Sequence, residues 1–253
     1  MLLDSFAHFC LKFGHITVIF PMVVLGIIFH KRDIYAKAAC FLLWVMIFNT
    51  LLKYLFKVPL FPHLGHGYAF PSGHMHAAAA FYGYIIYRTN NKIVKIALGI
   101  LLCCLGFSLI HCHFHDLKDV AGALGFYAVE LAVYHCIYSN WGDKIAGIAS
   151  IASAIAIMCA LAVIYKVEFH VWLAFYGLVG MESMLTITED VRLNSMLEKI
   201  AATALTALLV AGVYYLFKFI AFNKFYLSEI RFALAPFIIV GSMRIAQRFT
   251  RRV

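Results

Sequence analysis

Two short polar stretches of this sequence carry residue types that can do chemistry. The first, "FPSGHMH" at residues 70–76, leads into an apolar run. A proline at a helix start has no N–H to leave unpaired, and Ser72 is a good N-cap residue. Gly73 lets an anion approach the backbone N–H groups, so the stretch is predicted to begin a helix that cradles an anion. Capping does not need His74, which adds a group that can transfer a proton.

The second stretch, "HCHFHDLKD" at residues 111–119, combines a histidine with an acid. His115 and Asp119 are four residues apart and would share a face of a helix, where a carboxylate accepts from one ring nitrogen and orients the other. An imidazole held in this way is an oriented nucleophile or base. Lys53 and Lys57, at the end of an earlier apolar run, are expected to share a helical face by the same spacing.

The rest of the sequence is apolar enough to place these residues in a membrane protein. Of the 253 residues, 64% are hydrophobic and 13% charged, and the mean hydropathy is +0.89. A membrane span needs about 20 apolar residues. We therefore predict an all-α, polytopic transmembrane helix bundle of about nine spans. The predicted spans cover residues 13–30, 34–56, 72–88, 93–112, 118–139, 144–165, 169–187, 199–221 and 226–246.

The placement of charge predicts the orientation of these spans. The formal net charge is +9, but Lys and Arg fall at the ends of apolar runs rather than on one polar surface, which favours membrane topology over a nucleic-acid partner. By the positive-inside rule, the side with Lys31, Arg32 and Arg88 is cytoplasmic. The polar clusters then lie on the other side, where ionisable groups gathered at one membrane depth indicate a functional site. The N-terminus lacks the features of a cleavable signal peptide.

The combined motifs resemble those of a known family. "PSGH" at residues 71–74, then His115, and then Asp119 running into "DVAGALG", resemble the second and third motifs of the type 2 phosphatidic acid phosphatase superfamily of membrane lipid phosphatases. The resemblance covers roughly residues 35–140. It implies that His115 attacks phosphorus to form a phosphohistidine, that Asp119 orients it, and that His74 protonates the leaving lipid oxygen and then activates water. The phosphate would be bound by Ser72, Gly73 and Lys53, with no metal and no cofactor.

The resemblance also implies an organisation and a substrate class. A phosphatase-like transmembrane core of the first five spans is expected over residues 1–140, with additional transmembrane helices over residues 141–253 packing on it. The expected substrate is a phosphorylated lipid of the outer leaflet, such as a polyprenyl diphosphate, phosphatidate, phosphatidylglycerophosphate or a lipid A phosphate. The expected location is the membrane bilayer, as an integral multi-pass protein with its active site on the periplasmic side of a bacterial inner membrane. Whether the chain forms a homo-oligomer is left open.

Two arginines of the family pattern are absent from this chain. The first family motif is a lysine, six residues and Arg-Pro, whereas Lys53 is followed by "YLFKVP" and then leucine; the third begins with Ser-Arg, whereas Ser108 is followed by leucine. One charged donor can be worth on the order of a few kcal/mol in the transition state, so other groups must supply the charge. The candidates are Lys57, His63, His66, His76, His111 and His113, of which Lys57 and His111 are assigned to phosphate binding. Histidines in this role predict an acid-shifted activity optimum.

Several other functions remain open at this stage. A phosphohistidine can be transferred to an acceptor other than water, which would make the protein a lipid phosphotransferase. The missing arginines would also fit a catalytically inactive scaffold or transporter. A histidine-rich, metal-dependent membrane enzyme is a third alternative, although alternate histidines on a helix point to different faces. Glu130 and Glu182 in later spans are expected to be packing partners satisfied by their neighbours.

Overall fold

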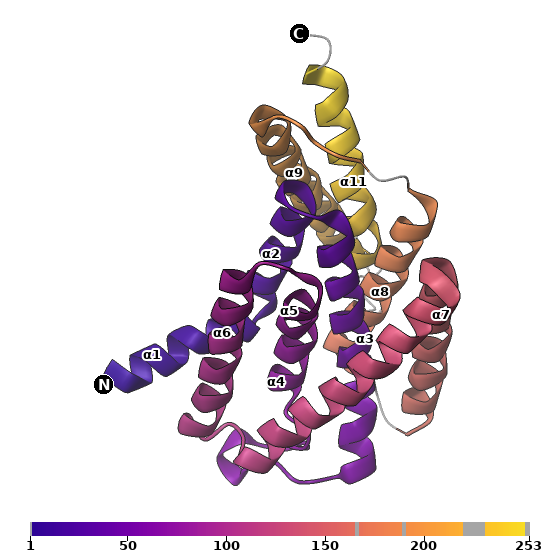
Figure 1. Ribbon diagram of the computed structural model, residues 1–253. Coiled ribbons are helices and arrows are strands. Elements are labelled where there is room, and N and C mark those ends of the chain that lie inside the picture. The colour runs from indigo at the N-terminus through magenta and orange to yellow at the C-terminus, as the bar shows by residue number, and fades with distance from the viewer. Residues whose placement is uncertain (1, 165–166, 189–190, 220–230, 251–253) are drawn as a thin grey trace.

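The computed structural model describes residues 2–164, 167–188, 191–219 and 231–250 as a bundle of helices with short connections (Figure 1). Their composition explains this architecture, because backbone polar groups in lipid must be satisfied within the segment, as a helix does. The elements are α1 (Leu2–Leu11), η1 (Lys12–Gly14), α2 (Ile16–Phe29), α3 (Arg32–Phe56), η2 (Pro62–Leu64), α4 (Gly73–Ala78), η3 (Ala79–Gly83), α5 (Tyr84–Arg88), α6 (Lys92–His111), α7 (Leu117–Ile164), α8 (Phe169–Ile187), α9 (Met196–Phe219) and α11 (Arg231–Thr250).

The predicted all-helical class is confirmed for the described residues, and several long apolar helices are compatible with a membrane bundle. Each predicted span overlaps helical segments where the chain is described, although residues 13–30 cross the break at His15 between η1 and α2. Residues 165, 220–221 and 226–230 of the predictions lie outside the described ranges. Among the described helices, five are individually long and apolar enough to cross a membrane, or six if the bent pair of residues 2–14 and 16–29 counts as one span. The number of nine spans therefore stays a prediction.

The long helix α7 contains two of the predicted spans and changes direction between them. Gly142 has φ 76°, outside the helical region, at the predicted break "SNWGDK". A side chain is strained at such a positive φ, and glycine is not. The two parts of α7 run in opposite directions on either side of this residue (Figure 1). The turn and the start of α3 lie at one end of the bundle, and the connections before α4 and α7 lie at the other end.

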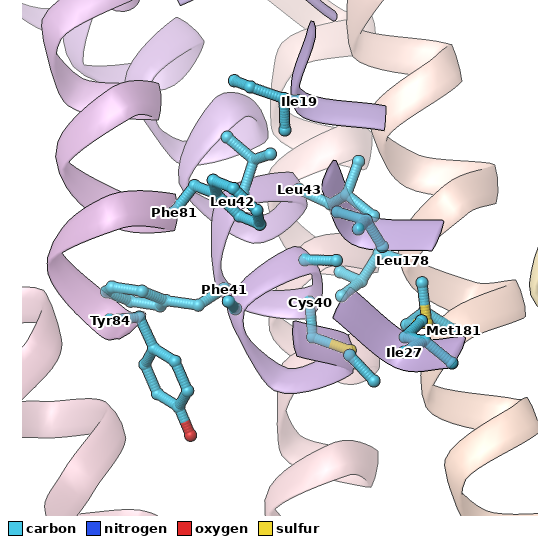
Figure 2. Close-up of a cluster of buried hydrophobic side chains, with 14 of the residues drawn as sticks. Ile19, Ile27, Cys40, Phe41, Leu42, Leu43, Phe81, Tyr84, Leu178 and Met181 are labelled. Carbon is cyan, nitrogen blue, oxygen red and sulfur yellow. The ribbon is translucent and has the colours of Figure 1, made fainter. Parts of the chain in front are cut away.

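Helix α3 occupies the middle of the bundle and packs against α2, α4, α5, α7 and α8. Its apolar side chains form the main core with those of α2, η3 and α8, as Figure 2 shows around Phe41 and Cys40. Ile27 of α2 and Leu178 of α8 contribute to this cluster, and Phe41 is fully buried. Helices α9 and α11 pack on each other, α11 packs on α8, and both also contact α2. The central position of α3 fixes the depth at which Lys53, near its end, is held.

Candidate active site

His115 and Asp119 form a buried hydrogen-bonded pair at the start of α7. His115 Nδ1 lies 3.0 Å from Asp119 Oδ2, and the two residues are 7% and 4% exposed. The expected pairing is therefore present, but for a different reason than a shared helical face, because α7 begins only at Leu117. Asp119 N donates to Asp116 Oδ1 at 2.8 Å and Asp119 Oδ2 accepts from Asp116 N at 3.3 Å. This reciprocal capping turn, typical of a helix start, holds the carboxylate in place.

The pairing assigns the roles of the two ring nitrogens of His115. A carboxylate accepts hydrogen bonds, so Nδ1 carries the proton that it donates to Asp119 and Nε2 keeps a free lone pair. Burial lowers the pKa of His115, the hydrogen bond to Asp119 raises it, and the positive charge of Lys53 lowers it. Burial is the largest of these effects. His115 is accordingly neutral at neutral pH, the form in which an imidazole is a nucleophile.

The "PSGH" stretch begins a helix, as the sequence predicts. Ser72 Oγ accepts from Met75 N at 3.4 Å, which is the expected N-cap bond. Ser72 is fully buried, and its N–H donates to the backbone oxygen of Asp119 at 3.1 Å. That bond joins the two motifs directly although they are far apart in the sequence. The helix continues from α4 through the π-helical η3 into α5.

His74 and Lys53 lie next to this junction. His74 is exposed, and it lies close enough to Lys53 and His115 for the positive charge of Lys53, and of His115 when that ring is protonated, to act on it. A Cβ built on Gly73 would lie 3.9 Å from Lys53 Cε, so the lysine stem passes beside the helix start. Lys53 Nζ donates to the backbone oxygen of Tyr68 at 2.7 Å. The structure thus brings His74, His115, Asp119, Gly73 and Lys53 together at one end of the bundle.

Lys57 does not share a helical face with Lys53, contrary to the expectation. Helix α3 ends at Phe56, and Lys57 adopts a left-handed conformation with φ 51°. The spacing of four residues places two side chains on one face only while the helix continues. Lys57 lies instead in the exposed connection that leads to η2. Its assignment to phosphate binding stays a prediction without support from the helix geometry.

Most of the other candidate histidines have partners away from His74 and His115. His111 Nε2 lies 3.0 Å from Asp4 Oδ1 of α1. His63 Nε2 lies 3.1 Å from the backbone oxygen of His113, and His76 is fully buried. The assignment of His111 to phosphate binding stays a prediction, and Asp4 is its partner in the structure. His66 is exposed in the connection before α4.

Two histidines that the sequence did not single out lie near His74. The charges of His15, between η1 and α2, and of His170, at the start of α8, both act on His74. His170 Nδ1 lies 3.2 Å from Glu168 Oε2, and the charge of Glu168 also acts on Lys53. Glu168 lies between the predicted spans 144–165 and 169–187, in a connection expected on the same side of the membrane as the two motifs. That shared side was the signal in the sequence that could have indicated His170. Their proximity to His74 depends on how α2 and α8 pack around α3.

Within the part of the chain that the structure describes, no group of three or more His, Cys, Asp or Glu side chains is arranged to hold a metal ion. Comparison of the sequence and the structure with models of known protein families, with curated proteins and with solved structures gives no match.

Proposed function

We propose that the protein is a membrane lipid phosphate phosphatase that works through a phosphohistidine. The observation that supports this most is the buried pair of His115 and Asp119, bonded through Asp119 to the helix start that carries His74. A nucleophile, the carboxylate that orients it, a second histidine for proton transfer and a lysine are the groups that metal-independent phosphoryl transfer requires. All of them lie at one end of a bundle of apolar helices.

In the proposed reaction, Nε2 of His115 attacks phosphorus while the bond from phosphorus to the lipid oxygen breaks. His74, protonated, donates its proton to that oxygen, so the lipid alcohol leaves neutral and phosphate stays on His115. For a diphosphate, the leaving group is the lipid monophosphate. His74 then takes a proton from a water molecule that attacks the phosphohistidine. Inorganic phosphate is released and both histidines return to their starting forms.

The remaining groups hold the phosphate and its developing charge. Lys53 lies beside Gly73, and in the described residues no hydrogen bond occupies the backbone N–H groups of Gly73 and His74. These donors suit the oxygens of a phosphoryl group. The charges of His15 and His170 act on His74 when these rings are protonated, so these two imidazoles are our candidates to replace part of the charge of the missing arginines. Both replacements are imidazoles, so the expectation of an acid-shifted optimum is retained.

A lipid substrate fits the surroundings of these groups. The helix that carries Asp119 exposes Leu117 (69%) and Leu124 (39%) beside the site. Apolar side chains exposed next to a polar cluster at a membrane surface suit a substrate whose headgroup reaches the cluster while its tails stay in lipid. The proposal includes lipid phosphomonoesters and lipid diphosphates of the non-cytoplasmic leaflet.

The test is release of inorganic phosphate from a panel of lipid phosphates by purified protein in chelator. Wild-type protein should release phosphate, and His115→Ala and Asp119→Ala should lose the activity. A labelled substrate should leave an acid-labile label on the wild-type chain and none on His115→Ala. Equal release by the variants would overturn the proposal. Transfer of label to a second lipid would indicate a phosphotransferase, chelator-sensitive release a metal enzyme, and no release from any substrate a scaffold or transporter.

A further inference from the structure

A chain of three buried polar residues lies directly beneath the candidate site. Asn49 Nδ2 is 3.0 Å from His76 Nδ1, and His76 Nε2 is 2.9 Å from Glu130 Oε2. Asn49, His76 and Glu130 are 5%, 0% and 7% exposed. They belong to α3, α4 and α7, the helices that also carry Lys53, His74 and Asp119. None of these three residues has a step in the proposed reaction.

The hydrogen-bond partners assign the direction of this chain. Asn49 Nδ2 also donates to the backbone oxygen of Pro71 at 3.4 Å, which fixes the orientation of the amide. His76 Nδ1 therefore accepts from Asn49, and Nε2–H donates to Glu130. His76 is neutral in this arrangement. Glu130 Oε1 has no hydrogen-bond partner among the described residues, so the bond from His76 is the one that holds this carboxyl group.

Packing alone does not account for three polar residues at this depth. Buried polar groups in an apolar interior cost free energy, and apolar side chains of similar volume are often at least as stabilising. Their placement indicates a task in orientation. Asn49 forms hydrogen bonds to Pro71 and to His76, the residues that flank the segment 72–75. These two bonds fix both ends of that segment relative to α3. His76 connects it to Glu130 and thereby to α7.

Two of the three residues also share helix faces with the candidate catalytic groups. Asn49 is four residues before Lys53 on α3, one turn away. Glu130 is eleven residues after Asp119 on α7, about three turns along the same face. Any movement of α4 relative to α3 or α7 would break a bond in this chain and move His74 relative to Lys53 and His115.

We propose that Asn49, His76 and Glu130 are positioning residues that hold His74 at its working place opposite His115. This inference rests on the proposed phosphatase function. A misplacement of about 1 Å between reacting groups can cost on the order of 100-fold in rate. The chain acts on the geometry of His74 and not on substrate contact, so its loss should lower kcat and leave KM nearly unchanged.

The experiment compares the rates of four variants of the full-length protein in detergent or nanodiscs. Glu130→Leu and Asn49→Ala should lower kcat by about 10- to 100-fold with KM within about threefold. Glu130→Gln keeps an oxygen that accepts from His76 Nε2 and should stay within about threefold of wild type. The matched control is Glu182→Leu, which removes an acid that is 2% exposed and also has an unpartnered oxygen, but lies among the residues at the opposite end of the bundle. It should leave kcat unchanged.

Hydrogen exchange at the amides of residues 72–76 tests the positioning role of these residues independently of the proposed phosphatase reaction. Exchange should be faster in Glu130→Leu and Asn49→Ala than in wild type, and unchanged in Glu182→Leu. Asn49→Ala leaves the pair of His76 and Glu130 in place, so it can be tested even if Glu130→Leu does not fold. Unchanged hydrogen exchange or an unchanged kcat in folded Asn49→Ala would overturn the proposal. Equal losses of kcat in Glu130→Leu and Glu182→Leu would also overturn it. If these variants exchange faster but the wild-type protein releases no phosphate, the proposed phosphatase function is overturned, while the structural role of Asn49, His76 and Glu130 in holding residues 72–76 stands.

Discussion

The hydrogen bond from His115 to Asp119 controls both the orientation and the proton affinity of the proposed nucleophile. Burial lowers the pKa of His115 and the Asp119 bond raises it. Asp119→Asn removes the raising effect, so the pKa of His115 should fall further and the acid limb of the kcat/KM profile should move to lower pH. The rate on the plateau should drop by about 10²- to 10⁴-fold, because the imidazole loses its fixed tautomer.

The measurement is the pH dependence of kcat/KM for wild-type and variant protein. Asp116→Asn is the control, because Asp116 takes part in the same capping turn through a side-chain oxygen that the amide retains, and it makes no hydrogen bond to His115. It should shift the acid limb less than Asp119→Asn does. An acid limb that moves to higher pH in Asp119→Asn would contradict the assigned direction.

The sequence predicted the residues whose bonds are local and missed those whose bonds are not. Ser72 caps α4 and His115 pairs with Asp119 because both interactions span at most four residues, and residue spacing encodes such contacts. The bond of His76 to Glu130 spans 54 residues. Nothing in the spacing of "HMH" distinguishes an exposed histidine from a buried one. His170 is missed for the same reason, since its place near His74 follows from the packing of α8.

At the scale of elements, the connection that carries "PSGH" is fixed by close packing on α7. A Cβ built on Gly122 would lie 2.2 Å from Phe70 Cε2, and Phe70 packs edge-on against Phe56, with their ring centroids 5.0 Å apart. The ring of Phe70 is thus enclosed by α3 and α7 immediately before Pro71. Gly122 has a steric role here, because a larger residue would displace the ring and with it the start of α4.

We predict that Gly122→Ala lowers phosphatase activity about tenfold and destabilises the protein by about 1–3 kcal/mol through overpacking. Gly125→Ala is the matched control on the same helix, because a Cβ there would meet nothing within 4 Å. It should keep full activity and gain slightly in stability from the higher helix propensity of alanine. Phosphate release and thermal unfolding of both variants in the same detergent test this. Equal behaviour of the two variants would show that Phe70 moves aside freely.

The helices themselves were largely predictable, and several of their ends were predicted to within one residue, but the direction of side chains at those ends was not. Apolar runs long enough to span lipid coincide with α3, α6 and both parts of α7, and the polar break at Gly142 marks the turn. The predicted span ended at residue 56, as α3 does, but the helical face expected to be shared by Lys53 and Lys57 is absent because the backbone leaves the helix at Lys57, with φ 51°. Helix ends depend on capping bonds with the following connection, and the spacing of side chains does not encode these.

At the scale of the whole molecule, the bundle has two polar ends of different character. Opposite the candidate active site lies a cavity of about 420 Å³, lined by charged residues that include Asp33, Lys37, Asp143 and Glu182. A smaller cavity of about 190 Å³ shares Lys37 and Asp143 with it. Helix α8 connects the two ends, because His170 near its start lies close to the site and Glu182 near its end lines the large cavity. Helix α11 joins the core mainly through α8, and α9 joins it through α2.

Lys37 holds this second end together, and its loss should affect stability without affecting the reaction. Its Nζ lies 2.7 Å from Asp33 Oδ1 and 2.8 Å from Asp143 Oδ2, which ties α3 to the turn of α7. Both acids are about half-exposed or more, so water compensates much of the lost attraction. Lys37→Met should cost about 1–2 kcal/mol and lower the melting temperature.

Phosphate release by Lys37→Met below its melting temperature should stay within about twofold of wild type, because Asn49, His76 and Glu130 fix the site independently of the far end. The measurements are thermal unfolding and kcat in the same nanodiscs. Lys144→Met is the control, because Lys144 also lines the cavity at this end but makes no ion pair among the described residues. A large loss of kcat in a folded Lys37→Met protein would mean that the two ends are coupled through α3. In that case the end of the bundle that contains the large cavity would influence catalysis as well as stability.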